Sequence, residues 1–189
     1  MERQLPTSNI KQRISKLAGE YGSLVYQCAY KILGDRHQAE DIAQEVFLKL
    51  FKKSCAQMDE VQHWGAYLKT MATSASCDFL RKRYHQQEVS EQAEVLPFVQ
   101  PNNDQLSGPE RSVENQIQLD LLREALARLK PQEAEVFVLR NIEQLSYQEI
   151  ADQLAINSGH VGAILHRTKD KLAVIFSETN SEEAVHVSN

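Results

Sequence analysis

The sequence lacks cysteines close enough to bind a metal ion together or to form a disulfide framework. Cys28, Cys55 and Cys77 are the only three in 189 residues, and each lies within or beside an apolar helical pattern. We therefore expect buried, reduced thiols and predict no metal and no cofactor. A glycine-rich phosphate loop and a His-Glu-x-x-His motif are also missing, and the six histidines are scattered. These absences argue against an enzyme.

Long apolar runs and an excess of positive charge are absent as well. No stretch approaches the roughly 20 residues that a membrane-spanning helix requires, and the first residues hold no apolar core of a signal peptide. A soluble, cytoplasmic protein is expected. The net charge is −5, whereas a protein that coats nucleic acid is basic. Any contact with nucleic acid must therefore come from local basic patches or through a partner protein.

Apolar residues recur at intervals of three and four along most of the chain, which is typical of helices. Only seven glycines and five prolines occur, and the prolines lie outside or at the start of these segments. Gly34 is the expected stop of the first helix, and Asp35 is the expected cap of the second. No strand-like alternation appears, so the predicted fold is all-α. Helices are predicted over about 10–33, 36–53, 63–85, 112–129 and 131–141, with a loop over 54–62.

A segment of different composition separates two helical parts. From Gln86 to Glu110 it holds three prolines and five acidic residues but neither Lys nor Arg, which is typical of an extended, flexible linker. The low apolar content after Ser177 predicts a disordered tail. The expected organisation is two small helical domains, a linker and a tail, at 8–85, 112–176, 86–111 and 177–189 respectively.

Residues 145–172, LSYQEIADQLAINSGHVGAILHRTKDKL, have the pattern of a helix-turn-helix. Ser146 and Glu149 have the spacing of a capping box, Ile156 and Asn157 would make the turn, and Ser158 would cap the second helix. Ile150, Ala151, Leu154, Val161, Ile164, Leu165 and Leu172 are expected to pack inward.

The second helix of this motif would enter a major groove with its N-terminal half. Arg167 is the best candidate for base or phosphate contact, because arginine can bond guanine bidentately. An ordinary helical hairpin is the alternative. The residues expected to face DNA are Ser158, Gly159, His160, Gly162, Ala163, His166 and Arg167, with Lys169 and Lys171 lying toward phosphates.

A second motif, AEDIAQEVFLKLF at 39–51, carries a polar stripe. Asp41, Gln44, Glu45 and Leu48 follow the spacing i, i+3, i+4 and i+7, so they share one helix face. A compact polar stripe that ends in an apolar residue suits docking onto helices of another protein, and a solvated face is the alternative. The expected buried side consists of Ile42, Val46, Phe47, Leu50 and Phe51.

Together the two motifs resemble those of bacterial RNA polymerase sigma factors of the sigma-70 family. The resemblance lies in Asp-x-x-Gln-Glu-x-Phe after Ala-Glu, in the helix with a basic end that follows, and in L-S-Y-x-E-I-A. The short two-domain build is similar to the extracytoplasmic-function (ECF) group, and the resemblance covers about residues 10–176. It implies sigma region 2 in the first domain and sigma region 4 in the second.

The resemblance implies two partners, core RNA polymerase and promoter DNA, with an anti-sigma factor as a candidate third. The stripe from Asp41 to Leu48 would dock on the clamp coiled coil of the largest polymerase subunit. The loop over 54–62 and the helix after it would melt the −10 element and hold its non-template strand, which needs aromatic surfaces and cations. For the aromatic residues core packing is the alternative, and for the basic ones a solvated helix end. The candidate −10 residues are Trp64, Tyr67, Ser74, Arg81, Lys82, Arg83 and Tyr84.

The second domain would bind the −35 element with its second helix and the polymerase flap with its apolar surface. Here the chain departs from the family pattern G-T-V-K-S-R-L-x-R, since residues 159–167 read GHVGAILHR and two cations are missing. Each lost phosphate contact lowers the salt dependence of binding by about 0.9, so weak −35 recognition by the isolated domain is expected. A second departure is Thr73-Ser74, where the family usually has Arg-Asn.

Three other functions compete with a promoter-specificity subunit. A sigma-like adaptor or decoy would bind an anti-sigma partner without opening promoters. A stand-alone helix-turn-helix regulator would bind duplex DNA by itself, but it would leave the stripe at Asp41 unexplained. An enzyme is the least favoured, because no catalytic constellation with usable spacing occurs.

Overall fold

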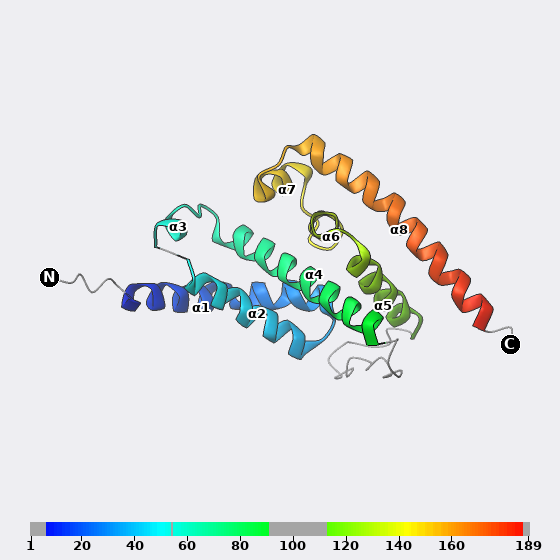
Figure 1. Cartoon of the computed structure of the whole chain (residues 1–189). Helices are drawn as coiled ribbons and strands as arrows, with labels where there is room; N and C mark the ends of the chain where they lie inside the picture. Colours follow the sequence, from blue (N-terminus) through cyan, green and yellow to red (C-terminus); the bar gives the residue numbers. More distant parts are fainter. Residues whose placement is uncertain (1–6, 54, 91–112, 187–189) are drawn as a thin grey trace. The chain divides into compact units, whose positions relative to one another are not determined.

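The computed structural model describes residues 7–53, 55–90 and 113–186. Within these ranges the chain forms eight helices and no strand (Figure 1), which confirms the all-α prediction. The chain divides into two compact units, 1–76 and 77–189, with the boundary inside helix α4. Most of the predicted linker lies outside the described residues, and the predicted domain bounds stay a prediction.

Helices α1 (Thr7–Leu33) and α2 (Arg36–Phe51) of the first unit pack along each other after a two-residue reversal. Gly34 has φ 73°, a left-handed conformation that glycine adopts without steric cost, and its N–H donates to the Tyr30 carbonyl at 2.8 Å. A carboxylate oxygen of Asp35 then accepts the Gln38 N–H at 2.8 Å and caps α2. The predicted stop and cap are both confirmed.

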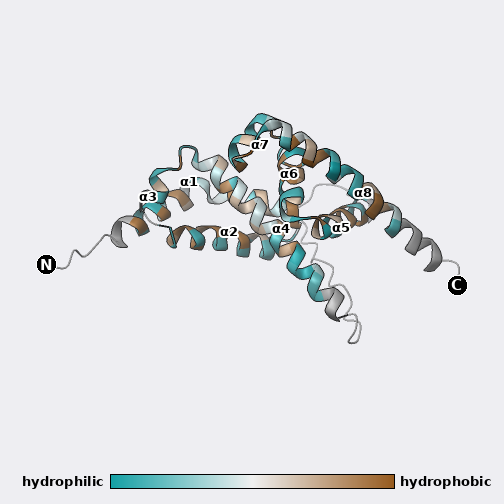
Figure 2. Cartoon of the chain, turned by 45° about the horizontal axis from the view of Figure 1, so that its top comes forward, coloured by the Kyte–Doolittle hydropathy of each residue, from teal (hydrophilic) through white to brown (hydrophobic). Residues whose placement is uncertain are grey.

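Each helix of the first unit contributes one apolar face to its core, and Figure 2 shows the polar and apolar sides in teal and brown. Burying a large aliphatic side chain stabilises a fold by roughly 1.5–3 kcal/mol. One buried polar group, Thr73 Oγ1, lies 3.4 Å from the Cys28 Sγ and so has a hydrogen-bond partner. The fully or almost fully buried apolar residues include Val25, Cys28, Ala29, Ile32, Ala39, Ile42, Val46, Leu50, Met58, Leu68 and Ala72.

The predicted loop over 54–62 contains a short helix, α3 (Cys55–Asp59). Met58 of α3 is fully buried, and its packing stabilises a helical turn that is too short to show helical periodicity in the sequence. The following helix, α4 (Trp64–Ser90), begins one residue after the predicted start and continues five residues beyond the predicted end.

The second unit holds helices α5 (Val113–Arg128), α6 (Pro131–Asn141), α7 (Tyr147–Leu154) and α8 (Ser158–His186). Pro131 is the first residue of α6, where its missing N–H costs nothing. The predicted inward residues Ile150, Ala151, Val161, Ile164, Leu165 and Leu172 are buried, and Leu154 packs on them partly buried. The core of the helix-turn-helix is therefore confirmed, with Val136 and Leu139 of α6 beneath it.

The disordered tail predicted from Ser177 is wrong as far as His186, because α8 continues to that residue. Arg128 Nη2 of α5 donates to Glu178 Oε2 at 2.7 Å, and Ser177 Oγ donates to the Val174 carbonyl at 2.7 Å. These contacts hold the turn at Glu178 against its own unit. Residues 187–189 lie outside the described residues.

Candidate functional site

Helices α7 and α8 form the predicted helix-turn-helix, and its entry is a capping box. Ser146 Oγ accepts the Glu149 N–H at 3.2 Å, while Glu149 Oε2 accepts the Ser146 N–H at 2.7 Å. Helix α7 ends at Ala155, which has φ 53° and ψ 44°. This left-handed conformation costs a residue other than glycine about 1–2 kcal/mol, and it turns the chain toward α8.

Asn157, not Ser158, caps helix α8. Asn157 Oδ1 accepts the His160 N–H at 2.7 Å, and Ser158 is the first residue of the helix. The prediction that Ser158 caps this helix is wrong by one position, since either residue type can cap and the turn geometry selected the asparagine. The Ser158 hydroxyl is thus left on the surface at the N-terminal end of α8.

Most of the residues predicted to face DNA share the outer face of α8. Ser158, Gly159, His160, Ala163, His166, Arg167 and Lys169 are exposed and Gly162 is half-buried. Val161, Ile164, Leu165 and Thr168 are buried on the opposite side. His166 Nδ1 lies 3.1 Å from Asp170 Oδ2. This face therefore carries few cations, chiefly Arg167 and Lys169.

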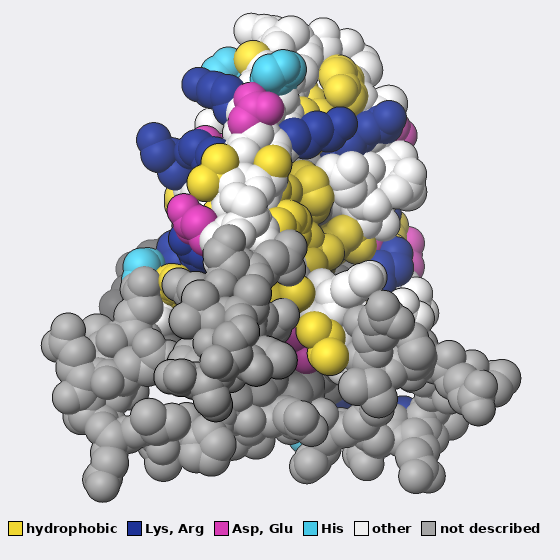
Figure 3. Space-filling model, turned by 90° about the vertical axis from the view of Figure 1, so that its right-hand side faces the viewer, with side chains coloured by type: hydrophobic (Ala, Val, Ile, Leu, Met, Phe, Trp, Pro, Cys, Tyr) yellow, Lys and Arg dark blue, Asp and Glu magenta, His cyan; other side chains and the backbone are white. Residues whose placement is uncertain are grey.

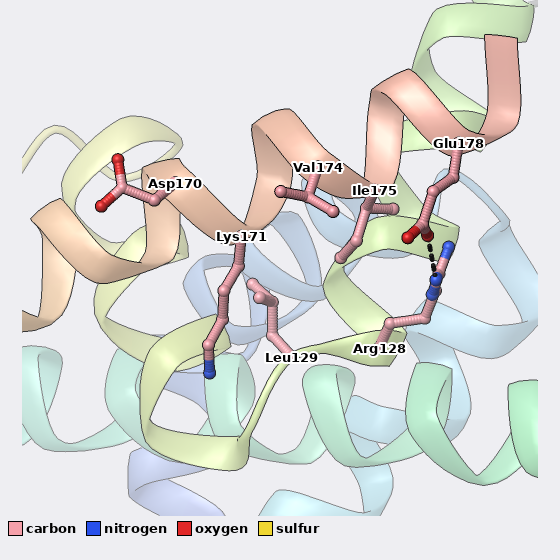
Figure 4. A pocket seen from close by; sticks show the side chains of 7 residues that line it. All are labelled: Arg128, Leu129, Asp170, Lys171, Val174, Ile175 and Glu178. Carbon is pink, nitrogen blue, oxygen red and sulfur yellow. Dashed lines mark hydrogen bonds and ion pairs between the residues drawn. The ribbon is translucent and has the colours of Figure 1, made fainter. Parts of the chain in front are cut away.

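Lys171, one helical turn after Arg167, differs from the other cations of α8 in having an ion-pair partner on α6. Its Nζ donates to both carboxylate oxygens of Glu133 on α6, at 2.7 and 2.8 Å. In Figure 4 the Lys171 side chain points away from that of Asp170. Burial acts to raise the pKa of Glu133, but the ion pair with Lys171 and the Lys130 N–H, 3.2 Å away, lower it, and the net pKa lies below its usual value.

Arg140 and Tyr147 stand beside the outer face of α8, although the sequence patterns did not single them out. The Arg140 guanidinium lies 5.3 Å from the centre of the Tyr147 ring and donates to the Leu145 carbonyl at 2.8 Å. A Cβ atom at Gly162 would lie 3.5 Å from the Tyr147 ring. Because the three residues belong to α6, α7 and α8, no periodicity within one helix could have grouped them.

The polar stripe on α2 is exposed along its whole length, from Asp41 through Gln44 and Glu45 to Leu48. Glu45 is paired within the helix to Lys49 Nζ at 2.7 Å. Leu48 is 60% exposed, and Phe51, three residues further, is 45% exposed. The prediction that Phe51 is buried is wrong, because the helix ends there and the described residues of its unit leave that side uncovered. The apolar end of the stripe thus consists of two large side chains.

The candidate −10 residues fall into two groups far apart on α4. Trp64 and Tyr67 lie at its start, while Arg81, Lys82, Arg83 and Tyr84 lie near its end. At about 1.5 Å per residue, Trp64 and Arg81 are roughly 25 Å apart along the helix axis. Ser74 is half-buried between them. Arg81 Nη1 donates to Asp78 Oδ1 at 2.7 Å, and its Nε and Nη2 are buried with no hydrogen-bond partner in the described part of the chain.

Two aromatic rings at the start of α4 each lie near a cation. Trp64 and Tyr67 meet edge to face, with ring centres 5.9 Å apart. The Arg13 guanidinium of α1 lies 5.9 Å from the Trp64 ring centre, and Lys53 Nζ lies 5.2 Å from that of Tyr67. Both rings are half-buried, so each combines core packing with an accessible surface. Core packing, the alternative considered for these rings, thus accounts for part of each ring, and their contact with DNA stays a prediction.

An open hollow of about 500 Å³ lies along α8 in the second unit. Figure 4 shows its lining, Arg128, Leu129, Asp170, Lys171, Val174, Ile175 and Glu178, with the ion pair between Arg128 and Glu178. Val174 is 55% exposed. Figure 3 shows apolar side chains in a band with Lys and Arg side chains on either side. This surface has the mixed character of a protein contact rather than of a small-molecule site.

Metal sites and membrane spans were sought over the described ranges. No group of three or more His, Cys, Asp or Glu side chains that could hold a metal ion occurs there. In the same part of the chain, no helix combines the length and the apolar character needed to cross a membrane.

Comparison with known proteins identifies the family. The family description "Sigma-70 region 2" matches residues 17–86, and "Sigma-70, region 4" matches residues 119–172. The chain is 30% identical over 156 residues to the ECF RNA polymerase sigma factor SigW of Bacillus subtilis, covering 80% of this chain and 82% of the relative. It is 26% identical over 179 residues to the RNA polymerase sigma factor YlaC of the same organism, covering 93% and 98%.

A third relative is longer than this chain. The ECF RNA polymerase sigma factor SigE of Mycolicibacterium smegmatis is 29% identical over 171 residues, which is 89% of this chain but 63% of the relative. The two matched regions enclose the α2 stripe and the helix-turn-helix, so the family evidence rests on the elements whose geometry is described above. The chain belongs to the sigma-70 family as a sigma factor of the ECF group, a promoter-recognition factor for transcription initiation.

Proposed function

We propose that this chain binds core RNA polymerase through α2 and aims it at promoters through α4 and α8. The observation that carries the proposal is the pairing of an exposed polar stripe in the first unit with an exposed recognition helix in the second. The relatives are named as RNA polymerase sigma factors, which supports these partners. Sigma factors are specificity subunits, so the chain itself performs no catalysis.

The polymerase-binding surface comprises Asp41, Gln44, Glu45 and Leu48, and we extend it to Phe51. Exposed aromatic and aliphatic side chains at the centre of a contact contribute most of the binding energy, while surrounding polar groups set specificity. Leu48 and Phe51 supply the first, and the acidic stripe supplies the second. A cationic face on the polymerase is the complementary surface.

Promoter DNA is contacted at two places. Trp64 and Tyr67 offer aromatic surface to unstacked bases of the −10 element, and Lys82 and Arg83 lie toward its phosphates, while Arg81 is held by Asp78. The outer face of α8, with Arg167 as its anchor, enters the major groove of the −35 element, and Arg140 and Tyr147 flank it. Lys171 is not among these contacts, because Glu133 holds it.

Few cations on the α8 face imply that the −35 contact alone is weak, so the polymerase supplies much of the binding energy. The proposed partners, core polymerase and the chromosome, lie in the bacterial cytoplasm, so we propose that the chain acts there. The band of apolar side chains along α8 suits either the polymerase flap or an anti-sigma factor.

Transcription with purified core polymerase tests the proposal. Sequencing of 5′ transcript ends from cells that overproduce the chain would first define its promoters. The purified chain added to core enzyme is then expected to give transcripts that start at those ends. A decoy would bind without promoter-dependent transcripts, and a stand-alone regulator would bind the promoter duplex tightly without polymerase. Failure to associate with core polymerase at low salt would reject the proposal.

A further inference from the structure

Arg13 of α1 connects the end of α3 with the start of α4. Its Nη1 donates to Asp59 Oδ1 at 2.5 Å, and its Nη2 donates to the Met58 carbonyl at 3.2 Å. Its guanidinium carbon lies 5.9 Å from the ring centre of Trp64, the first residue of α4. One side chain thus contacts both ends of the four-residue connection 60–63.

The contacts of Arg13 use its whole guanidinium group. The two nitrogens bind a carboxylate and a carbonyl at the C-terminal end of a helix, where cations are favoured. The planar face lies near an aromatic ring, as in a cation–π pair. The Met58 carbonyl also accepts the Val61 N–H at 3.4 Å. Since Met58 is fully buried, this network joins the connection to the core.

An ordered aromatic surface favours the capture of a base that has left the duplex. Stacking of a base on an aromatic side chain is favourable. That gain is reduced when the protein surface must first be ordered, because ordering a side chain costs conformational entropy. Arg13 orders Trp64 and the neighbouring connection in the folded protein, before DNA arrives.

We propose that Arg13 is a positioning residue for promoter melting, holding Trp64 and residues 60–63 in the arrangement that receives an unstacked base. This inference rests on the proposed function as a promoter-melting factor. It assigns a role in strand capture to α1, a helix that carries none of the sequence motifs. Lys16, an exposed cation of the same helix, provides a matched control for the loss of charge.

The test compares Arg13→Gln, Arg13→Lys and Lys16→Gln in the full chain. Trp64 is the only tryptophan, so acrylamide quenching of fluorescence in the free protein reports its exposure directly. Permanganate reactivity of unpaired thymines reports promoter opening by the holoenzyme, and core affinity and the melting temperature are measured in parallel. Promoter opening by the wild-type holoenzyme tests the proposed function. Quenching of Trp64 in the free protein tests the Arg13 contact without polymerase, so failure of one can be told from failure of the other.

Arg13→Gln is expected to increase quenching of Trp64 and to reduce promoter opening about tenfold, with core affinity within twofold of wild type. Arg13→Lys keeps the charge but loses the planar guanidinium group, and it is expected to show less than half of the wild-type promoter opening. Lys16→Gln is expected to open the promoter as the wild type does. Unchanged quenching in Arg13→Gln would overturn the proposal. So would equal defects in Arg13→Gln and Lys16→Gln, or a loss of opening that only parallels a loss of core binding.

Discussion

Lys171 and Glu133 join the recognition helix to the helix beneath it. Lys171 Nζ lies 2.7 and 2.8 Å from the two carboxylate oxygens of Glu133, which is only 8% exposed. Glu133 also accepts the N–H of Lys130 before α6. The pair therefore ties the start of α6 to the middle of α8, one helical turn after Arg167. The sequence predicted that Lys171 lies toward phosphates, and in the folded chain its ammonium group is paired with Glu133.

Lys171→Ala is expected to destabilise the protein by about 1–2 kcal/mol, the range for a hydrogen bond to a charged group when one partner remains partly exposed. The loss of the cation leaves the Glu133 carboxylate without its main partner. Urea unfolding measures the change, and Lys169→Ala, an exposed cation two residues away, is the control. If Lys171→Ala keeps full stability and instead weakens binding to the −35 element, Lys171 is a DNA contact after all.

The stability that Glu133 contributes is expected to disappear in acid. Its folded pKa lies below the ordinary 4.5, so the unfolded chain takes up the proton first as pH falls. The contribution is thus present above about pH 4.5 and is lost as pH drops through the folded pKa. Glu133→Gln should be less stable than wild type at pH 7, and the two should converge in acid. A gap that stays constant with pH would contradict this assignment.

Glu135 is expected to show the opposite dependence. Burial raises the pKa of Glu135 to about 7, and the carboxylate of Asp78 adds to the rise. The folded protein therefore keeps a proton that the unfolded chain loses near pH 4.5, and the penalty grows with pH until it is complete above about pH 7. Glu135→Gln should stabilise the protein by roughly 1–3 kcal/mol at pH 8, and little at pH 4. Thermal unfolding at both pH values measures this.

Gly162→Lys is expected to strengthen binding to the −35 element. A Cβ atom there would be 3.5 Å from the Tyr147 ring, an ordinary contact, so the substitution fits. One added phosphate contact should steepen the salt dependence by about 0.9. Gly162→Ala is the control, since it shares the gain in helix propensity of up to about 1 kcal/mol without the charge. Footprinting of the holoenzyme over a salt series separates them, and equal slopes would place residue 162 away from phosphates.

Asp41→Arg is expected to lower affinity for core polymerase at least tenfold while leaving circular dichroism unchanged, because Asp41 is exposed and its reversal places a cation in the docking stripe. Glu40→Arg makes the same change of charge at an exposed neighbour outside the stripe and is the control. Affinity can be measured by titrating labelled protein with core enzyme. Equal losses in both variants would show a general charge effect rather than a stripe.

Local features of the fold were predictable because their causes lie within one or two helical turns. The left-handed Gly34, the cap at Asp35 and the box between Ser146 and Glu149 all depend on neighbouring residues. The cap of α8 marks the limit of such reasoning, since Asn157 and Ser158 are equally suitable residues. Only the path of the chain after Ala155 decides between them.

The candidate site was predictable in its faces but not in its supporting contacts. Periodicity correctly placed the stripe of Asp41, Gln44, Glu45 and Leu48 on the surface, together with one side of the N-terminal half of α8. It failed at Phe51, because the burial of a residue at a helix end depends on what packs beyond the end. It also failed over 54–62, where the burial of Met58 stabilises a short helix.

The sequence by itself determined that the chain is helical, where most helices begin and end, and which family it resembles, because caps, spacing and motifs are local. The tertiary structure alone decided which charged groups pair with partners from distant parts of the chain. Lys171 meets a partner 38 residues away and Arg13 one 46 residues away. Such distant residues become neighbours only when helices pack, and the ion pair that then forms cannot be recognised from local sequence patterns.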